Sequence, residues 1–247
     1  MCGRYATTMS TGELQLEFRF DVVAESYLPS PSWNVAPTQD IPIVVERKAI
    51  TGDQWVHDAV GAPSSPLGTA PEGGRRVRAL TPASWGLIPS WAKDASRPMI
   101  NARLETLGEK RSFAPSLESR RCIIPASGYF EWRKADRCPF YIYRSDGRPL
   151  AFAGLYSWWK AGTDWVLTAT IVTRRAQGEL ANVHDRTPAL LEREEYDAWL
   201  SAEVGKEVLD RLERPQAPLS FHPVTRAVGN ARNNEPENIE SVNATSD

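Results

Sequence analysis

Cysteine is scarce in this sequence of 247 residues, where it occurs only as Cys2, Cys122 and Cys138. An odd number of widely spaced cysteines argues against a disulfide framework and favours the reduced thiols of cytosolic proteins. The three histidines are scattered too, and neither Cys-x-x-Cys nor His-x-x-x-His occurs. Because such pairs supply the ligands of most structural zinc sites, the sequence predicts no metal centre and indicates no cofactor.

Long apolar runs are also missing. No stretch approaches the roughly 20 apolar residues that a transmembrane helix needs, and no basic segment followed by an apolar core opens the chain as in a secretory signal. We therefore expect a soluble cytoplasmic protein without a membrane partner. An excess of charge of one sign is absent as well: the formal net charge is −2, which by itself gives no indication of a nucleic-acid partner.

The order of the patterned segments predicts an α+β fold. Strand-like segments dominate the middle of the chain and helical patterns come late, so we expect a curved, barrel-like mixed β-sheet flanked by helices in a single domain. A capping hydroxyl also predicts a short helix after Ser10 and Thr11. The predicted strands are 41–48, 76–88, 121–132, 139–145, 150–159, 164–173 and 219–225, and the later helices are 192–202 and 204–214.

Two segments lie outside this pattern. Residues 61–74 are rich in proline, glycine and serine and predict a surface loop. The end of the chain carries acidic residues and no basic one, which is typical of a solvated tail. We therefore expect one domain over residues 2–234 and a flexible acidic tail over residues 235–247.

Cys2 directly follows the start methionine, and at this position a cysteine can have a reactivity that an internal cysteine lacks. Initiator methionine is generally removed before a small residue, which would leave Cys2 at the terminus of the mature chain. An α-amine has a pKa of about 7.7–8.0, against about 10.4 for lysine, so it is far more nucleophilic near neutral pH. The amine can form a Schiff base with an aldehyde, and the thiol can close that imine into a thiazolidine. The alternative is a small residue at a frayed terminus.

Four groups of polar residues are embedded in apolar or turn-forming sequence. They are Asn34 ahead of Pro37 in WNVAPTQ, Asn101, Arg103 and Glu105 in INARLET, Glu131 in SGYFEWRK, and His184, Asp185 and Arg186 in NVHDRTP.

Each group has a structural as well as a functional interpretation. Glu131 is either a strand-end carboxylate paired with an arginine, or an acid whose aromatic neighbours desolvate it and raise its pKa. His184 is either a satisfied structural histidine or an acid–base group. Asn101 can cap a helix that starts at Ala102, or act in a site. Trp132 is either a core residue or a platform on which a base stacks. The arginines Arg4, Arg103, Arg111 and Arg186 are either solvated or contact phosphates.

The motifs also occur in a specific order: MCGRYA, WNVAPTQ, WGLIPSW, INARLET, RCIIPASGYFEW, IVT, VHDRTP and FHPVTRAVGNARNN. This ordered set closely resembles the SOS response-associated peptidase family of abasic-site processing proteins, over residues 2–234. The resemblance implies a sensor of abasic sites in single-stranded DNA, with the DNA as its partner. In such proteins the N-terminal cysteine reacts with the ring-opened deoxyribose aldehyde and leaves a thiazolidine cross-link that shields the lesion.

The resemblance also implies roles for individual residues. Cys2 would be the nucleophile, Asn101 would orient its amine or the sugar, Glu131 would shuttle protons, and His184 would assist Schiff-base formation and its reversal. The DNA path would comprise Gly3, Arg4, Asn34, Pro37, Trp91, Arg103, Arg111, Trp132, Thr173 and Arg186, with Pro37 near a strand-separating wedge. We expect a monomer that acts on replicating DNA and associates with the nucleoid.

Two other classes of function stay open. An N-terminal-nucleophile peptidase could use Cys2, Glu131 and His184 to remove Met1 and cleave other peptides. A non-catalytic module could bind single-stranded DNA through tryptophan and arginine, and would tolerate Cys2→Ala. β-Elimination through the same Schiff base would be a side branch of cross-linking and not a rival to it.

Overall fold

Five strands close into a barrel because the last strand of the row also pairs with the first. The computed structural model describes residues 2–24, 29–48, 76–201 and 207–242. The ring runs in the order β11 (Asp164–Arg175), β10 (Leu150–Ala161), β7 (Arg121–Ala126), β4 (Asp40–Lys48) and β5 (Arg76–Trp85). All these neighbours are antiparallel, but β5 returns to β11 in parallel, with Ala169 opposite Trp85. The predicted curved, barrel-like mixed sheet in an α+β fold is confirmed.

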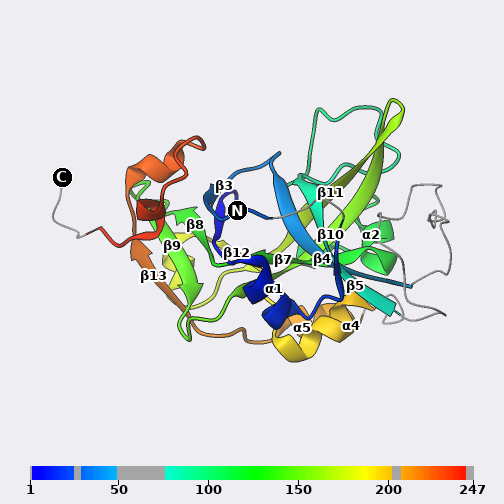
Figure 1. Ribbon diagram of the computed structural model, residues 1–247. Coiled ribbons are helices and arrows are strands. Elements are labelled where there is room, and N and C mark those ends of the chain that lie inside the picture. The colour runs from blue at the N-terminus through cyan, green and yellow to red at the C-terminus, as the bar shows by residue number, and fades with distance from the viewer. Residues whose placement is uncertain (1, 25–28, 49–75, 202–206, 243–247) are drawn as a thin grey trace.

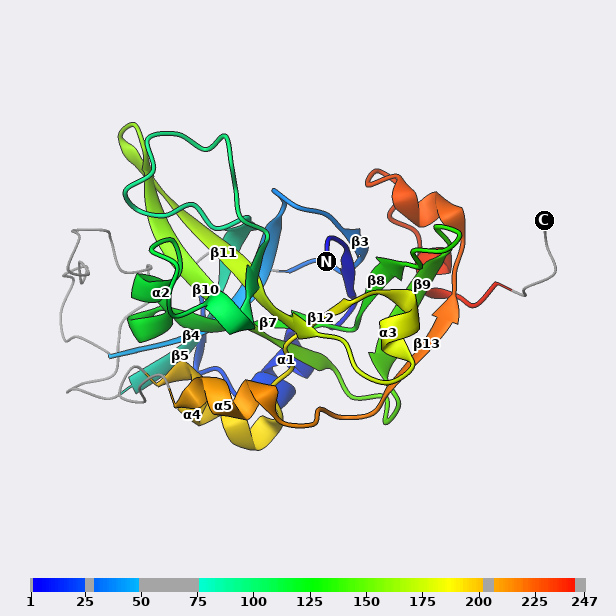
Figure 2. The same ribbon diagram turned by 180° about the vertical axis from the view of Figure 1, so that it is seen from behind.

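Three short strands extend the barrel sheet, and five others form a second sheet. The extensions are β2 (Val22–Val23), β6 (Asn101–Arg103) and β12 (Arg186–Pro188); the second sheet has the order β13 (Leu219–Pro223), β9 (Pro139–Arg144), β8 (Gly128–Trp132), β1 (Tyr5–Thr7) and β3 (Ser32–Val35). The start of the chain lies between this sheet and the barrel (Figures 1 and 2).

Residues 121–132, predicted as one strand-like segment, are divided between the two sheets. The chain leaves β7 at Ala126 and enters β8 at Gly128. Ser127 marks the change, because its backbone N–H donates to the Ala6 carbonyl at 2.7 Å and its hydroxyl accepts from the backbone N–H of Thr8 at 3.0 Å. One continuous apolar segment therefore connects the barrel to the sheet that carries the start of the chain.

The two faces of the barrel strands have different neighbours. One face packs against the helices α1 (Thr11–Phe18), α2 (Ala114–Ser119), α4 (Tyr196–Leu200) and α5 (Val208–Glu213). The buried residues of the other face, among them Ile43, Trp85 and Phe152, form a separate cluster that none of these four helices joins; of the described helices only the short α3 (Leu180–Val183) packs against it, through Leu180. Because the helices cover the outside, this second cluster lies within the barrel. It includes Cys2.

Buried arginines attach the helices to the strands. Arg121 on β7 donates to the carbonyls of Leu117 and Trp199, each at 2.6 Å, near the ends of α2 and α4. Arg174 on β11 donates to the carbonyl of Leu212 at 2.8 Å at the end of α5. A cation at a helix C-terminus satisfies carbonyls that have no partner inside the helix. These arginines therefore hold the helical layer in place.

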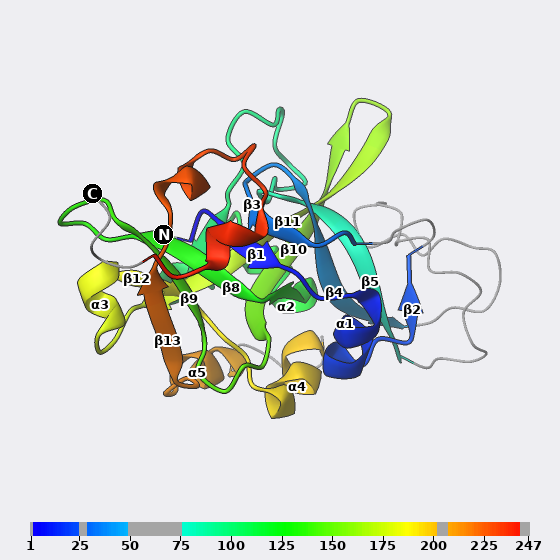
Figure 3. The same ribbon diagram turned by 60° about the vertical axis from the view of Figure 1, so that its left-hand side comes forward.

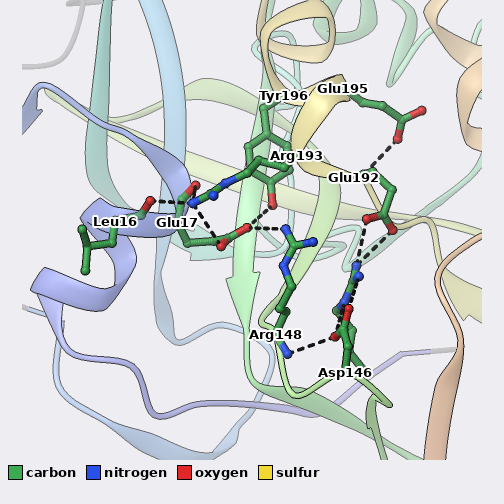
Figure 4. A network of polar contacts seen from close by, with 9 residues as sticks. Leu16, Glu17, Asp146, Arg148, Glu192, Arg193, Glu195 and Tyr196 are labelled. Carbon is green, nitrogen blue, oxygen red and sulfur yellow. Dashed lines mark hydrogen bonds and ion pairs between the residues drawn. The ribbon is translucent and has the colours of Figure 1, made fainter.

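A charged network attaches α1 to the same layer (Figure 4). Glu17 accepts from Arg148 at 3.2 Å and from the hydroxyl of Tyr196 at 3.1 Å. Arg144, at the end of β9, is buried and binds Glu192 at 3.0 Å. The predicted helix start is confirmed as well, since Ser10 and Glu13 form a capping box.

The later helices are shorter than predicted. Within the predicted helix 192–202, the structure has a 3₁₀ turn, η2 (Arg193–Glu195), followed by α4, which ends at Leu200; α5 starts at Val208. Two further short helices are α3 (Leu180–Val183) and η1 (Leu104–Thr106). Residues 202–206 of the predicted helices, the predicted loop 61–74 and residues 243–247 of the tail lie outside the described residues.

The prediction of a flexible tail from residue 235 is wrong for residues 235–242. Two 3₁₀ helices, η3 (Arg226–Gly229) and η4 (Pro236–Ile239), return the chain to the second sheet (Figure 3). Asn238 is buried, His222 contacts the Ile239 carbonyl at 2.9 Å, and the Val242 N–H donates to the Pro223 carbonyl at 3.0 Å. These contacts make the segment part of the folded body.

In the described part of the chain, no helix is long and apolar enough to cross a membrane.

Gly154→Ala tests the packing inside the barrel. A Cβ at Gly154 would lie 2.8 Å from Cys122 Sγ and 2.9 Å from Ile124 Cδ1. We expect the free energy of unfolding to fall by about 1–3 kcal/mol, because a filled interior tolerates added atoms poorly. The matched control is Gly12→Ala, where the nearest atom, Ser10 Oγ, is 4.0 Å away. Urea unfolding should show a lower midpoint for Gly154→Ala only; equal midpoints would contradict the packing.

Candidate active site

Cys2 is held inside the protein by both sheets. Its side chain is 0% exposed within the barrel cluster. Its carbonyl accepts a hydrogen bond from Asn101 Nδ2 at 2.7 Å. Two residues later, the Arg4 carbonyl accepts from the backbone N–H of Phe130 at 2.9 Å. The start of the chain is therefore fixed from the β6 side and from the β8 side, unlike a frayed terminus.

Asn101 opens a strand and does not cap a helix. It begins β6, which pairs in parallel with β11 so that Asn101 lies opposite Ile171. The alternative of a helix starting at Ala102 is wrong. The Asn101 Oδ1 atom is buried and has no hydrogen-bond partner within the described ranges. One end of this amide thus holds Cys2, and the other end is a buried acceptor beside it.

Glu131 lies on β8 and is 3% exposed. Burial is the main reason why its pKa is raised to about 7. The pKa of the Cys2 thiol is also raised, first by burial and then by the negative charge of Glu131. Cys2 and Glu131 therefore interact electrostatically inside the protein. Near neutral pH the thiol is protonated, and Glu131 exchanges its proton readily.

His184 follows α3 and is electrically neutral at neutral pH. Desolvation is the largest cause that lowers its pKa, and the nearby charge of Asp185 acts in the opposite direction. Its Nδ1 accepts the backbone N–H of Arg186 at 3.0 Å. The same Nδ1 lies 3.1 Å from Asp185 Oδ1. Asp185 is exposed and also binds Lys134 at 3.2 Å, so its effect on His184 is screened by solvent.

Sequence reasoning missed a buried pair that connects the strand of Glu131 to the segment of His184. The hydroxyls of Tyr129 on β8 and Thr187 on β12 lie 2.9 Å apart. Burial raises the pKa of Tyr129, with smaller contributions from Cys2 and Glu131. Tyr129 could have been recognised from its spacing: it precedes Glu131 by two residues, and residues two apart on a strand lie on the same face.

Three residues expected along the DNA path, Asn34, Thr173 and Arg186, are buried. The Arg186 guanidinium binds both carboxylate oxygens of Glu105, at 2.6 and 2.9 Å, and donates to the Thr173 carbonyl at 2.6 Å. Thr173 is 0% exposed. The sequence indicated no role for Glu105, although its place in the same motif as Asn101 and Arg103 could have suggested one. Arg4 and Asn34 are also engaged internally, with each other and with the segment that follows β13.

The other expected residues lie closer to solvent. Trp91 is 52% exposed, and the Arg111 guanidinium lies 5.0 Å from the centre of its ring. This arrangement is a cation–π contact on an open surface. Arg103 is exposed, Pro37 and Gly3 are half-buried, and Trp132 packs partly against the cluster around Phe130 and Val228.

The structure thus places Cys2 beside Asn101 and within the electrostatic influence of Glu131. The Tyr129–Thr187 contact joins the strand of Glu131 to the strand that follows His184. In residues 2–24, 29–48, 76–201 and 207–242, no three histidine, cysteine, aspartate or glutamate side chains gather in a way that could hold a metal ion. The side chains of these residues supply a thiol, a carboxyl group of raised pKa and a neutral imidazole.

Residues 1–231 match the family described as SOS response associated peptidase (SRAP). The chain belongs to this family. It is 33% identical to the abasic site processing protein YoqW of Bacillus subtilis, over 98% of this chain and 100% of that protein. The abasic site processing protein YedK of Escherichia coli is also 33% identical, with the same coverage. The mouse abasic site processing protein HMCES is 30% identical over 84% of this chain and 64% of its own length.

Solved structures support the fold of this SRAP chain. A crystal structure of a protein from Bacteroides thetaiotaomicron superposes with a TM-score of 0.76 at 24% identity, over 98% of this chain and 100% of that one. At this identity the likeness concerns the fold alone.

Glu131→Gln tests the electrostatics of the site. Because the pKa of Glu131 is raised to about 7 from 4.5, the folded protein binds this proton more tightly than the unfolded chain does. The contribution to stability is fully present below about pH 4.5 and is lost as pH rises through about 7. Glu131→Gln should therefore gain about 3 kcal/mol relative to the wild type between these limits.

Urea unfolding across this pH range measures that difference. Glu13→Gln is the matched control, since hydrogen bonds from Ser10 lower the pKa of this exposed carboxylate, and it should show no such gain. A difference between Glu131→Gln and the wild type that stays constant with pH would contradict the raised pKa.

Proposed function

We propose that this protein recognises abasic sites in single-stranded DNA and cross-links to them through Cys2, which shields the lesion. The observation that carries the proposal is the anchored, buried position of Cys2 beside Asn101 and Glu131. Membership of a family whose curated members are named abasic site processing proteins supports the choice of substrate.

The reaction begins with maturation. Hydrolysis of the Met1–Cys2 peptide bond consumes one water and releases methionine, which frees the α-amine of Cys2. This amine adds to the aldehyde carbon of the ring-opened deoxyribose and gives a carbinolamine, which loses water to form an imine. The thiol then adds to the imine carbon while its proton passes to the nitrogen. The product is a thiazolidine, and cross-linking releases one water in total.

Burial of the thiol determines the order of these steps. The pKa of Cys2 is raised by its apolar surroundings and by the negative charge of Glu131, so the thiol stays protonated and the amine attacks first. With a pKa of about 7, Glu131 can take a proton from the amine and return one during ring closure. Asn101 Oδ1, a buried acceptor, can hold the amine or a sugar hydroxyl.

His184 is suited to protonate the leaving hydroxyl of the carbinolamine. The backbone N–H of Arg186 occupies its Nδ1, so a neutral ring presents an N–H at Nε2. The same group can act in the reverse direction and hydrolyse the imine, and the imine also permits β-elimination as a side reaction.

Exposed residues supply the first contacts with DNA. Arg103 and Arg111 suit phosphates, and Trp91 offers an open ring for stacking. The half-buried Pro37 and Trp132 would follow along the same path, whereas Thr173 and Arg186 are buried and bind each other. A covalent product lessens the need for a strongly basic surface, which is consistent with the small net charge. We propose that the protein acts as a monomer at replicating DNA in the cytoplasm.

Cys2→Ala and Cys2→Ser separate the steps of this reaction. The purified protein is first tested for loss of Met1 by intact mass, then incubated with single-stranded DNA that carries one abasic site. We expect a heat-stable shifted band on a denaturing gel for the wild type and none for Cys2→Ala. Cys2→Ser keeps the amine but lacks sulfur, so it should give a labile or strand-cleaving species.

Other outcomes would favour another function. Reversible DNA binding that is identical in wild type and Cys2→Ala, without an adduct, would indicate a non-catalytic module. Hydrolysis of peptides beyond Met1 without any DNA adduct would indicate a peptidase.

A further inference from the structure

The segment after β13 is fastened to β3 by side chains from two sequence motifs that the cross-linking reaction does not use. Asn234 Oδ1 accepts the backbone N–H of Trp33 at 2.7 Å and the hydroxyl of Ser32 at 3.0 Å. Asn233 and Asn238 bind each other within the segment at 3.1 Å. The last described part of the chain thus lies beside β1 and β3, close to the start of the chain (Figure 3).

Asn34 is the centre of this attachment. It is 1% exposed, and its Nδ2 lies 3.2, 3.0 and 2.6 Å from the carbonyls of Val228, Asn230 and Asn233. Its Oδ1 accepts from Arg4 Nη1 at 2.8 Å. An amide has two N–H donors and one carbonyl, so both ends of this side chain are occupied. A buried side chain with these partners has no group left to present to DNA.

Arg4 connects the segment to Cys2. Its Nη1 also donates to the Val228 carbonyl at 2.8 Å, and its Nη2 donates to the Gly229 carbonyl at 3.4 Å. Its backbone carbonyl is held by Phe130 at 2.9 Å. Arg4 is therefore fixed at both its side chain and its backbone, two residues after Cys2.

We propose that Asn34 and Arg4 are positioning residues, which hold Cys2 in place for cross-linking through the segment 226–234. This inference rests on the proposed function and differs from the expectation that both residues contact DNA. Imine formation and ring closure require the reacting atoms to lie about 3–3.5 Å apart, and a misplacement of about 1 Å can cost roughly a hundredfold in rate. A chain terminus has only one neighbour, so contacts such as these must supply the missing constraint.

The test is the rate of cross-linking in a single turnover, measured on the matured protein as a function of the concentration of abasic single-stranded DNA. The plot gives a maximal rate and a half-saturating concentration. For Asn34→Ala we expect the maximal rate to fall about tenfold, with the half-saturating concentration within about twofold of the wild type. Arg4→Lys should behave alike, because an ammonium cannot reproduce the planar fork of guanidinium.

Arg111→Ala is the contrasting variant. It removes an exposed cation, so the half-saturating concentration should rise while the maximal rate changes little. If Asn34→Ala shows this pattern instead, Asn34 acts on DNA binding and the proposal is overturned.

Asn234→Ala distinguishes a loss of positioning from a loss of folding. Asn234 is exposed, so this variant removes an attachment of the segment with little effect on the core. A threefold fall in maximal rate at an unchanged melting temperature supports positioning, whereas a wild-type rate for both Asn34→Ala and Asn234→Ala overturns it. Failure of the wild type itself to cross-link would reject the proposed function, which is a distinguishable result.

Discussion

The hydrogen bond from Asn101 Nδ2 to the Cys2 carbonyl is the constraint on which the rest of the site depends. It joins the start of the chain to β6, and β6 pairs with the barrel strand β11. On the other side, Arg4 joins the start of the chain to β8. Cys2 therefore lies where the two sheets meet, and contacts from both sheets hold the start of the chain. Cys2 is buried one residue after the start of the chain, in a region that is normally the most mobile part of a protein.

Burial at this position also determines the protonation states. The same loss of solvent that keeps the Cys2 thiol protonated raises the pKa of Glu131 to about 7 and lowers that of His184. Glu131 is then close to the state in which it can give or take a proton at neutral pH, while the thiol stays protonated. A carboxylate in this environment destabilises the folded protein above neutral pH, as expected where acid–base function competes with stability.

Local sequence patterns predicted the features that depend on near neighbours. The helix that starts after Ser10, β4 and the other strands of the barrel follow from capping and strand signals in a few consecutive residues. The division of residues 121–132 between two sheets was not predictable in this way. It depends on the contact of Ser127 with Ala6, more than a hundred residues away.

For the side chains, too, the sequence predicted what depends on residue type and not what depends on the tertiary structure. Residue type identified Cys2, Asn101, Glu131 and His184 as candidates, and the ordered motifs gave the family. Nothing in the type of an arginine tells whether its partner is a phosphate or a carboxylate, so the Arg186–Glu105 pair was not foreseen. The Tyr129–Thr187 pair was missed because its strands meet only in the tertiary structure.

Peptide mapping of the adduct by mass spectrometry tests most directly whether both reactive atoms of Cys2 capture the sugar. Trypsin should release the residues Cys2–Arg4 without Met1, carrying the deoxyribose remnant formed with loss of one water. The sulfur in this peptide should resist alkylation by iodoacetamide because it is bonded to the sugar carbon. Attachment of the sugar to a lysine, or a Cys2 thiol that alkylates freely within the adduct, would contradict the account.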